Sequence, residues 1–529
     1  MRYADMLNEH PAPVTERTRP DQVKNEAGGY VFEANAWTRL ERFLILGADT
    51  DTYYVGKQKL ARDNAGNLLA CIAEDGIRTV DVIAQVSNTG RAPKNDAAIF
   101  ALALCVAKGN PTVKAHALAK LTDVCRTGTH LFAFLEECKG LGVKWGRMFK
   151  RGVTAWYLRD ATSLGFQLMK YRQRGGWSHQ DALRLTHPKT EDAALKALFA
   201  ALMDKTVDEN LPKAYKAFME ISEAGISKSR VIDLIQSHRL PWEVVPTEMH
   251  KDRDVWAALL PNMGYTALVR NLGRLSNLGL TEVGGKTLTT VLDKLGNVPQ
   301  GRIHPIQLMI AMKRYSSGKG DKGDMTWTPC SQVTKAINDA FYLSFDKQDK
   351  CNKSVRVAID VSGSMSMGSG VLGFRLHEVA GCMAMAVLHA FPNSEVIGVD
   401  GAIHNFDFHG RRLDDVARIL GNIQGGITNL ALVHEYKTAS TPDMTVMYSD
   451  NITWQGHHVH EAWAKAKRAN PNAKTVNVVM VPNHYSLHPQ EDQTVLQVAG
   501  FDASVPSLIA AFLNGPTSAF ESADEAEDE

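Results

Sequence analysis

Residues 355–365, VRVAIDVSGSM, constrain the fold more than any other segment of the chain. Apolar side chains alternate along the first half, which predicts a buried strand, and the run then breaks into serine and glycine, which predicts a loop. The loop presents Asp360, Ser362 and Ser364 at every second position, so one carboxylate and two hydroxyls can turn toward a single point. These hard oxygen donors suit Mg²⁺ or another hard divalent cation better than zinc. Because they neither saturate nor neutralise such an ion, we expect an open coordination position for an acidic ligand.

Two downstream loops offer further oxygen donors. Thr428 lies in a loop that begins with Gly425, and Asp450 follows the apolar run 444–447. Loops at the carboxyl edge of an open α/β sheet converge, so the sequence predicts one metal site. Its ligands would be Asp360, Ser362, Ser364, Thr428 and Asp450. This order resembles the metal-ion-dependent adhesion site of von Willebrand factor A-type domains. Taken alone, Ser-Gly-Ser can also be only a tight turn. A haloacid-dehalogenase-like phosphatase is disfavoured, because it would need a second aspartate at position 362.

Length and composition narrow the class of protein. A chain of 529 residues exceeds one ordinary core and predicts two to four domains, and 44% hydrophobic with 22% charged residues are typical of a soluble globular protein. No apolar run reaches the roughly 18 residues that cross a bilayer, and the N-terminus lacks a signal-peptide core, so we expect a cytoplasmic protein that contacts no membrane. The seven cysteines are scattered without a Cys-x-x-Cys pair, which predicts reduced core residues.

The order of periodic segments predicts the domain organisation. Residues 1–30 are polar and contain three prolines, and we expect them to form an N-terminal surface arm. Residues 31–346 show helix after helix, which a stack of HEAT-like or armadillo-like hairpins would bury, although no sharp period is present. In residues 353–515 strands alternate with helices, which predicts a doubly wound α/β domain with a parallel sheet. Residues 516–529 contain six acidic side chains and are predicted to be a disordered tail.

Within the α/β domain the pattern gives approximate element positions. Strands are expected near residues 355–359, 394–400, 444–448 and 475–481, and helices near 373–390, 412–420, 429–439, 458–468 and 506–513.

Basic charge is concentrated in residues 139–189, where eleven Lys and Arg residues face two acids. Since solvated helix faces usually mix both signs, this excess favours a polyanion site. Aromatic residues are interleaved with the charges and would stack on unpaired bases, but the interpretation that they point into the core is favoured. A histidine in this region, such as His187, is either a core or capping residue or a donor to phosphate. The candidate RNA-binding residues are Lys139, Lys144, Arg147, Lys170, Arg172, Arg174, His187 and Lys189.

Several longer motifs resemble the Ro autoantigen (TROVE-module) family. They are Gly28-Gly-Tyr30, RLERFLILG at 39–47, Thr52-Tyr-Tyr54, RTGTHLF at 126–132, KYRQRGGWSH at 170–179, LVRNLG at 268–273 and RIHP at 302–305. The resemblance covers residues 25–515. It implies a ring of HEAT-like helical repeats closed by a von Willebrand factor A-type domain. It also implies binding of small noncoding Y RNA on the outer surface, and of single-stranded ends of misfolded RNA in a basic central hole lined by Lys170, Arg174 and His187. The chain departs from the family where Ile427 precedes Thr428 and Asn429 replaces an aspartate.

Two functions follow as hypotheses. The first is a non-catalytic RNA-binding protein of RNA quality control and stress response, monomeric, with a bound divalent metal for which Mg²⁺ is favoured. The second is a metal-dependent adhesion or scaffold module that binds an acidic protein ligand. A metal-dependent hydrolase is disfavoured, because the motif supplies no evident general base. The sequence names neither the RNA nor a protein partner, and an exoribonuclease is one candidate for such a partner.

Overall fold

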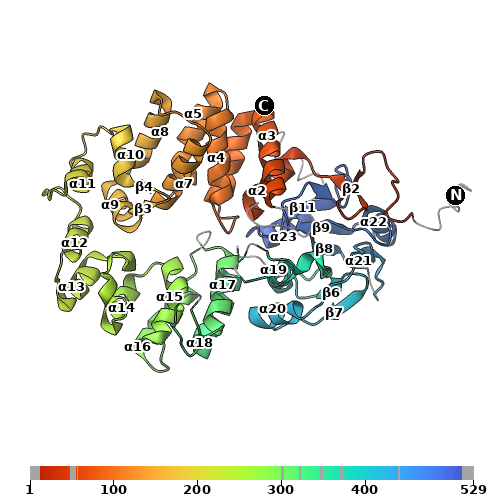
Figure 1. Ribbon diagram of the computed structural model, residues 1–529. Coiled ribbons are helices and arrows are strands. Elements are labelled where there is room, and N and C mark those ends of the chain that lie inside the picture. The colour runs from red at the N-terminus through yellow and green to blue at the C-terminus, as the bar shows by residue number, and fades with distance from the viewer. Residues whose placement is uncertain are drawn as a thin grey trace, which may run out of the picture.

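The computed structural model describes residues 12–47, 55, 57–299, 303–320, 323–345, 350–369, 371, 373–438 and 441–514. Helices fill the first part of the chain, and strands alternate with helices after residue 350 (Figure 1). The helices follow one another around a ring whose two ends meet at the α/β domain, which confirms the predicted fold class. Residues 52–54, Arg302 and the acidic tail lie outside the described residues.

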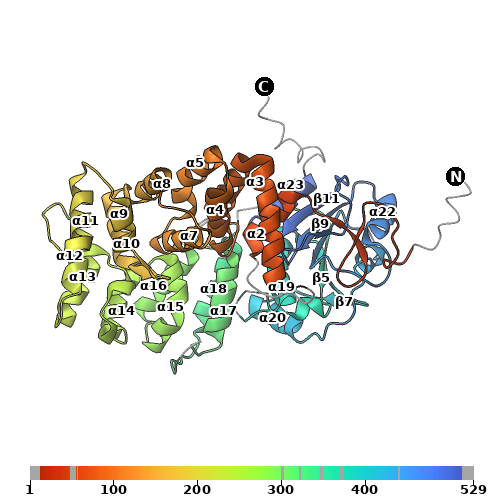
Figure 2. The same cartoon turned by 45° about the horizontal axis from the view of Figure 1, so that its top comes forward.

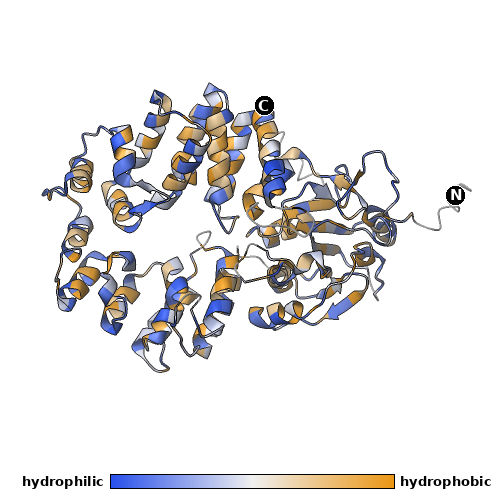
Figure 3. Cartoon of the chain, in the orientation of Figure 1, coloured by the Kyte–Doolittle hydropathy of each residue, from blue (hydrophilic) through white to orange (hydrophobic). Residues whose placement is uncertain are grey.

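The helical part begins with α2, and successive helices pack against their neighbours along the chain. Figure 3 shows α4 mostly in hydrophobic colours, and its side chains from Ala101 to Val106 are all buried between neighbouring helices. The helices are α2 (Ala36–Leu46), α3 (Lys57–Asn88), α4 (Asp96–Lys108), α5 (Pro111–Ala119), α6 (Leu121–Val124), α7 (Gly128–Gly140), α8 (Arg147–Tyr157), α9 (Ala161–Lys170), α10 (His179–Thr186), α11 (Ala193–Asp204), α12 (Lys213–Ile221), α13 (Lys228–His238), α14 (Arg253–Leu259), α15 (Tyr265–Asn277), α16 (Lys286–Gly296), α17 (Pro305–Ser316) and α18 (Ser331–Leu343).

Polar side chains fix many of the helix starts. Asn35, Asn110, Thr127 and Asp160 each accept a hydrogen bond from a backbone N–H in the first turn of α2, α5, α7 and α9. Such caps satisfy donors that have no partner within the helix. Between α9 and α10, the short strands β3 (Gln173–Arg174) and β4 (Trp177–Ser178) form a hairpin that packs against α7.

A six-stranded sheet forms the centre of the α/β domain, in the order β11-β9-β8-β5-β6-β7. All neighbouring strands are parallel except β6 and β7. The strands are β5 (Val355–Asp360), β6 (Ser394–Val399), β7 (Ile403–Phe406), β8 (Met444–Ser449), β9 (Lys474–Val479) and β11 (Val495–Ala499). The helices are α19 (Leu376–Ala390), α20 (Leu413–Gly421), α21 (Leu432–Glu435), α22 (Val459–Ala469) and α23 (Val505–Asn514). The sequence therefore predicted the four central strands and missed the two edge strands.

The two faces of the sheet belong to different cores. Val357 and Ile359 of β5 join a cluster that includes α19 and α23 and continues through the helical ring. Ala358, between them, joins a smaller cluster with Val433 of α21 and Val459 of α22. The alternation of side chains along one strand thus places helices on both faces, as the pattern predicted.

The described part of the segment expected to be a surface arm, residues 12–30, contains one strand and the first residue of a second. β1 (Val23–Lys24) pairs with β2 (Tyr30–Glu33), and β2 pairs with β10 (Tyr485–Ser486) of the α/β domain. Val14 is buried, and the backbone of Gly29 lies so close to the Thr453 carbonyl that a Cβ would be 2.0 Å from it. Short strands with few apolar residues give a weak periodic signal, which is why the arm interpretation was wrong for this segment.

The ring closes where α2 lies beside β11 (Figures 1 and 2). The side chain of Arg42 in α2 is buried and donates to the carbonyls of Asn483 and Tyr485 and to the side chain of Gln497. His304, just before α17, contacts the Phe501 carbonyl through Nε2 at 2.7 Å. Both ends of the helical part are therefore bonded to the α/β domain. No helix of the described residues is long and apolar enough to span a membrane.

Candidate functional site

Asp360 lies at the carboxyl end of β5, with β6 and β8 on either side. In the sheet, β6 and β7 lie on one side of β5, and β8, β9 and β11 lie on the other. The strand order therefore reverses at β5, and open α/β sheets bind ligands at the carboxyl edge of such a switch point. One carboxylate oxygen, Oδ1, accepts a hydrogen bond from Ser362 N at 2.9 Å. The other, Oδ2, is buried and accepts none from the described residues.

The predicted ligand residues Ser362, Ser364 and Asp450 lie together beside Asp360. The Oγ atoms of Ser362 and Ser364 are 3.2 Å apart, and Ser364 hydrogen-bonds the carboxylate of Asp450. Burial, together with the negative charge of Asp450, raises the pKa of Asp360 well above its usual range. Burial also raises the pKa of Asp450 to about 6, against the hydrogen bonds from Ser364 and the Ile452 N–H. Two carboxylates buried together without a cation repel each other.

The loop that carries Thr428 is fixed against both other loops. The Gly363 N–H donates to the Gly426 carbonyl at 3.0 Å, and the Thr428 carbonyl accepts from the Trp454 N–H at 3.3 Å. At Gly425 a Cβ would lie 2.4 Å from the Val361 carbonyl oxygen, so only glycine permits this approach. The side chain of Thr428 is buried. The three loops therefore meet at one edge of the sheet, with Thr428 between the other two.

The two departures from the adhesion-site pattern have different surroundings. Ile427 is partly exposed and packs over Gly401, where a Cβ would meet it at 2.6 Å. The Asn429 side chain lies beside Gly456, and the backbone N–H of Asn429 donates to the Asp400 carbonyl at 2.9 Å. The Thr428 loop is thus tied to the end of β6 as well.

A third carboxylate near this edge was not predicted from the sequence. Asp400 follows β6 directly and accepts hydrogen bonds from the Ala402 N–H at 2.9 Å and the Gly426 N–H at 3.3 Å. Burial opposes its ionisation, but these bonds and the one with His404 lower its pKa. The signal was its place at the end of a predicted strand, as for Asp360.

The donor set fits a hard divalent cation. It combines two carboxylates with serine and threonine hydroxyls, all buried, and it contains neither sulfur nor imidazole. A bound cation would neutralise the paired charges of Asp360 and Asp450 and give the unbonded Oδ2 of Asp360 a partner.

The basic residues of 139–189 gather around the β3–β4 hairpin. Arg172, just before the hairpin, and Arg174 on β3 are exposed. His187 is exposed where it ends α10 in a left-handed conformation, with φ 49°. Lys139, Lys144, Arg147 and Lys189 are exposed as well. The hairpin contacts α7 and α10, and Trp177 of β4 donates to Glu136 of α7 at 2.8 Å. The sequence-predicted cations thus lie on neighbouring elements.

Lys170 differs from the other predicted cations. Its Nζ lies 3.4 Å from Glu243 Oε1, and only 19% of its side chain is exposed. The same ammonium lies 5.4 Å from the ring centroids of Phe166 and Tyr171. Glu243 comes 73 positions later in the chain, so spacing gave no sign of this ion pair.

Three aromatic side chains of this region belong to the core. Phe149, Trp156 and Tyr157 are buried, while Trp145, Tyr171 and Trp177 are partly exposed. His179 is buried and hydrogen-bonds Tyr157 Oη through Nδ1 at 2.9 Å. The interpretation of these aromatics as core residues is therefore confirmed for the buried three.

Comparison with known proteins identifies both parts of the chain. A family model described as the TROVE domain matches residues 23–237 and 236–314, and one described as the Ro60 vWA domain matches residues 354–513. A protein named RNA-binding protein RO60 from Deinococcus radiodurans is 33% identical over 95% of this chain and 97% of its own length. Another of that name from Caenorhabditis elegans is 28% identical over 94% of this chain and 91% of its own length.

The architecture also matches a solved structure. The crystal structure of the Deinococcus radiodurans RO (RSR) protein superposes with a TM-score of 0.66 at 31% identity. The match covers 91% of this chain and all of that one. The chain therefore belongs to the Ro60 family of TROVE-domain proteins.

Proposed function

We propose that this protein binds RNA through the exposed cations around the β3–β4 hairpin. The observation that carries the proposal is the gathering of Arg172, Arg174, His187 and Lys189 on adjoining elements in a region with an excess of nine positive charges. Both curated relatives are named RNA-binding proteins, which supports the same function. Cations neutralise phosphates and release counterions, so binding would be strong at low salt and weaker at high salt.

The proposed contact is mainly with phosphates. Phe149, Trp156 and Tyr157 are buried, which leaves Trp145, Phe166, Tyr171 and Trp177 for stacking on bases. Contacts with phosphates carry no sequence information, so such a surface would bind RNAs of many sequences. It would distinguish RNAs by whether a single strand is accessible. We therefore propose single-stranded ends of misfolded noncoding RNA as ligands at this surface. Small Y-type noncoding RNA is the proposed ligand of the outer face.

This RNA preference would place the protein in RNA quality control and the stress response. We propose a monomer that acts in the cytoplasm, with an exoribonuclease as a candidate partner for degrading the bound RNA. The protein's own role in this proposal is binding without catalysis.

A bound Mg²⁺ at the sheet edge is a second part of the proposal. Asp360, Ser362, Ser364, Thr428 and Asp450 would hold the ion, and the open position would take a carboxylate from a protein ligand. The unbonded Oδ2 of Asp360 beside a second buried carboxylate favours this metal-dependent adhesion function. It would operate alongside RNA binding.

The test uses two labelled RNAs that share one hairpin, of which only one carries a single-stranded 3′ extension. The proposal expects tighter binding of the extended RNA on native gels at moderate salt. Equal affinities for the two RNAs would contradict the preference for strand ends, and no binding of either would contradict the function. Crosslinking in the protein's own cells, followed by sequencing, would identify the natural RNA.

A further inference from the structure

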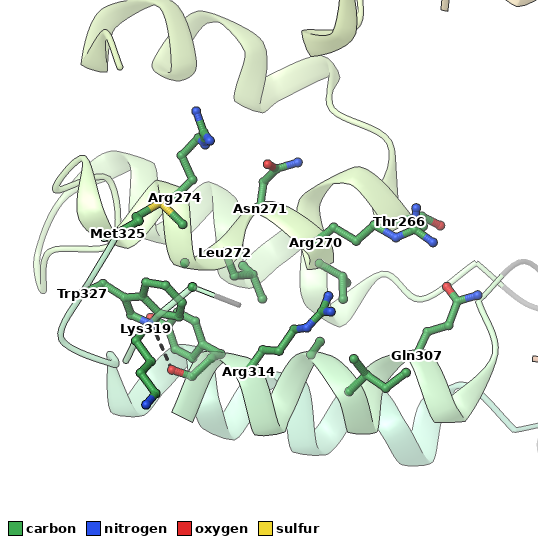
Figure 4. A pocket seen from close by; sticks show the side chains of 16 residues that line it. Thr266, Arg270, Asn271, Leu272, Arg274, Gln307, Arg314, Lys319, Met325 and Trp327 are labelled. Carbon is green, nitrogen blue, oxygen red and sulfur yellow. Dashed lines mark hydrogen bonds between the residues drawn. The ribbon is translucent and has the colours of Figure 1, made fainter. Parts of the chain in front are cut away.

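A cavity of about 500 Å³ opens between α15 and α17 and is bounded at one end by Lys319, Gly320, Met325 and Trp327 (Figure 4). One wall is the LVRNLG motif at residues 268–273, which the RNA-binding surface at the hairpin does not use. Leu268 and Leu272 of the motif are buried, whereas Arg270 is exposed. The motif therefore serves both the helical core and the cavity.

One end of the cavity is firmly built. The indole ring of Trp327 lies against Gly273, where a Cβ would be 2.7 to 2.8 Å from three ring carbons. Its Nε1 donates to the Tyr315 carbonyl at 2.9 Å, and the Tyr315 hydroxyl hydrogen-bonds Ser276 Oγ at 2.8 Å. Both the glycine of the motif and the loop are thereby fixed in place.

The lining is strongly cationic. Its basic members are Arg270, Arg274, Arg314 and Lys319, and the sixteen lining residues include no acid. Figure 4 shows Arg314 reaching from α17 toward α15 and Arg270 lying at the edge of α15, whereas Arg274 is turned away. Arg274 donates to the His250 carbonyl at 2.8 Å, so its charge serves the scaffold. Arg270 makes no ion pair with the part of the chain that the structure describes.

Apolar groups line the space between these charges. Val269 of α15 and Ile310 of α17 belong to the lining, and the amide of Gln307 stands at the far end from Trp327. A bare inorganic anion needs only charge, while a pocket of this size with mixed walls suits a small organic ligand. A nucleotide supplies both parts, a phosphate for the arginines and a base for the apolar walls.

We propose that this cavity binds one nucleotide unit of an RNA strand, with Arg270 and Arg314 on the phosphate. This inference rests on the proposed RNA binding and adds a second contact point to it. In Figure 1, α15 and α17 lie in the opposite arc of the ring from α9 and α10. A strand held at both places would cross the ring.

The test compares the affinities of variants for the hairpin RNA with and without the single-stranded 3′ extension. Arg270→Ala with Arg314→Ala removes two charges, and Ile310→Trp fills the cavity while keeping both. Each is expected to weaken the extended RNA about tenfold and the unextended RNA much less. Arg418→Ala on α20 removes an exposed arginine elsewhere, one that pairs with Asp415, and is expected to leave both affinities unchanged. Thermal melting checks that every variant is folded.

Competition identifies the source of the nucleotide. Displacement of the extended RNA by uridine monophosphate, but not by inorganic phosphate, would support a pocket that accepts a free nucleotide. Weakened RNA binding in the cavity variants without such displacement would support a unit within a strand. Equal competition by phosphate or by polyglutamate would overturn the nucleotide assignment.

Two further outcomes separate the pocket from the hairpin surface. The pocket would be overturned if Arg270→Ala/Arg314→Ala kept wild-type affinity. It would also be overturned if that double variant weakened RNA binding and Ile310→Trp did not. Either result would leave the proposed RNA binding intact. If the wild type bound neither RNA, the proposed function would fail. Uridine monophosphate binding that Arg270→Ala/Arg314→Ala abolishes would then support the pocket, and no such binding would overturn it.

Discussion

Arg91 donates two hydrogen bonds to Oδ2 of Asp502, from Nε at 2.9 Å and from Nη2 at 2.7 Å. Arg91 lies between α3 and α4 of the helical ring, and Asp502 lies just before α23 of the α/β domain. The Asp502 side chain is fully buried, and Glu41 is the second partner of the guanidinium at 3.1 Å. This ion pair therefore joins two parts of the chain that are 411 positions apart.

Asp502→Asn should destabilise the protein by about 3 to 5 kcal/mol, because it leaves the mostly buried Arg91 without its main counter-charge. Urea unfolding monitored by circular dichroism measures the change. Arg19→Ala is the control, since Arg19 and its partners Asp21 and Glu491 are exposed and each such pair contributes about 0 to 1 kcal/mol. A loss below about 1 kcal/mol for Asp502→Asn would show that the pair does not hold the ring closed.

His304 should make the ring closure sensitive to acid. Burial lowers its pKa to about 4, although its Nε2 contacts the carbonyls of Arg91 at 3.0 Å and Phe501 at 2.7 Å. An unfolded histidine has a pKa near 6.5, so between about pH 6.5 and 4 the unfolded state binds the extra proton. This contribution to stability is present above about pH 6.5 and is lost toward pH 4, by up to about 1.4 kcal/mol per pH unit.

His304→Gln removes the titrating group and should reduce the pH dependence of the urea midpoint in that range. Other buried histidines, such as His179 and His488, remain and preserve part of the dependence. An unchanged pH profile in His304→Gln would contradict the assignment.

Glu243 should restrain RNA binding at Lys170. Since the carboxylate holds the ammonium at 3.4 Å, Glu243→Gln frees the cation and removes a negative charge from the site. We expect about a threefold to tenfold gain in affinity for the extended RNA at low salt, shrinking as salt increases. Glu209→Gln, a change at an exposed acid between α11 and α12, is the control and should have little effect. A loss of affinity in Glu243→Gln would mean that the ion pair positions Lys170 for RNA.

Mg²⁺ should raise the melting temperature of the wild type at millimolar concentration, because binding to the folded state alone stabilises it. Asp360→Ala should abolish this increase and leave RNA binding unchanged, since the hairpin cations lie in the helical part. Asp407→Ala, on the exposed segment after β7, is a carboxylate control. An Mg²⁺ response that persists in Asp360→Ala would place the metal elsewhere.

Local patterns predicted much of this structure. The alternation in residues 355–359 gave β5, and the same rule gave β6, β8 and β9, all central strands with buried residues on both faces. The edge strands β7 and β11 are mostly half-buried, so their apolar pattern is weaker and they were missed. The Asp-x-Ser-x-Ser spacing is local, so the sequence alone predicted that the candidate ligands Asp360, Ser362 and Ser364 lie close together.

Such local patterns did not predict contacts between positions far apart in the chain. The pairing of Lys170 with Glu243 and of Arg91 with Asp502 depends on how helices stack and where the ring closes. The same holds for the cavity, since Arg270 and Arg314 line one space only after α15 and α17 pack together. Charge density in the sequence located the basic region, and only the fold distinguishes a paired cation from an exposed one.

The salt dependence of RNA affinity in Lys170→Ala/Arg174→Ala tests the central claim most directly. For a single strand, each phosphate that loses its cation should reduce the log-log slope by about 0.7. If both side chains contact phosphate, the double variant reduces the slope by about 1.4 and weakens the extended RNA by roughly 1 to 3 kcal/mol. The affinity for the RNA without the extension should change much less. Equal decreases for both RNAs would indicate a general electrostatic surface, and wild-type slopes for both would remove these residues from the site.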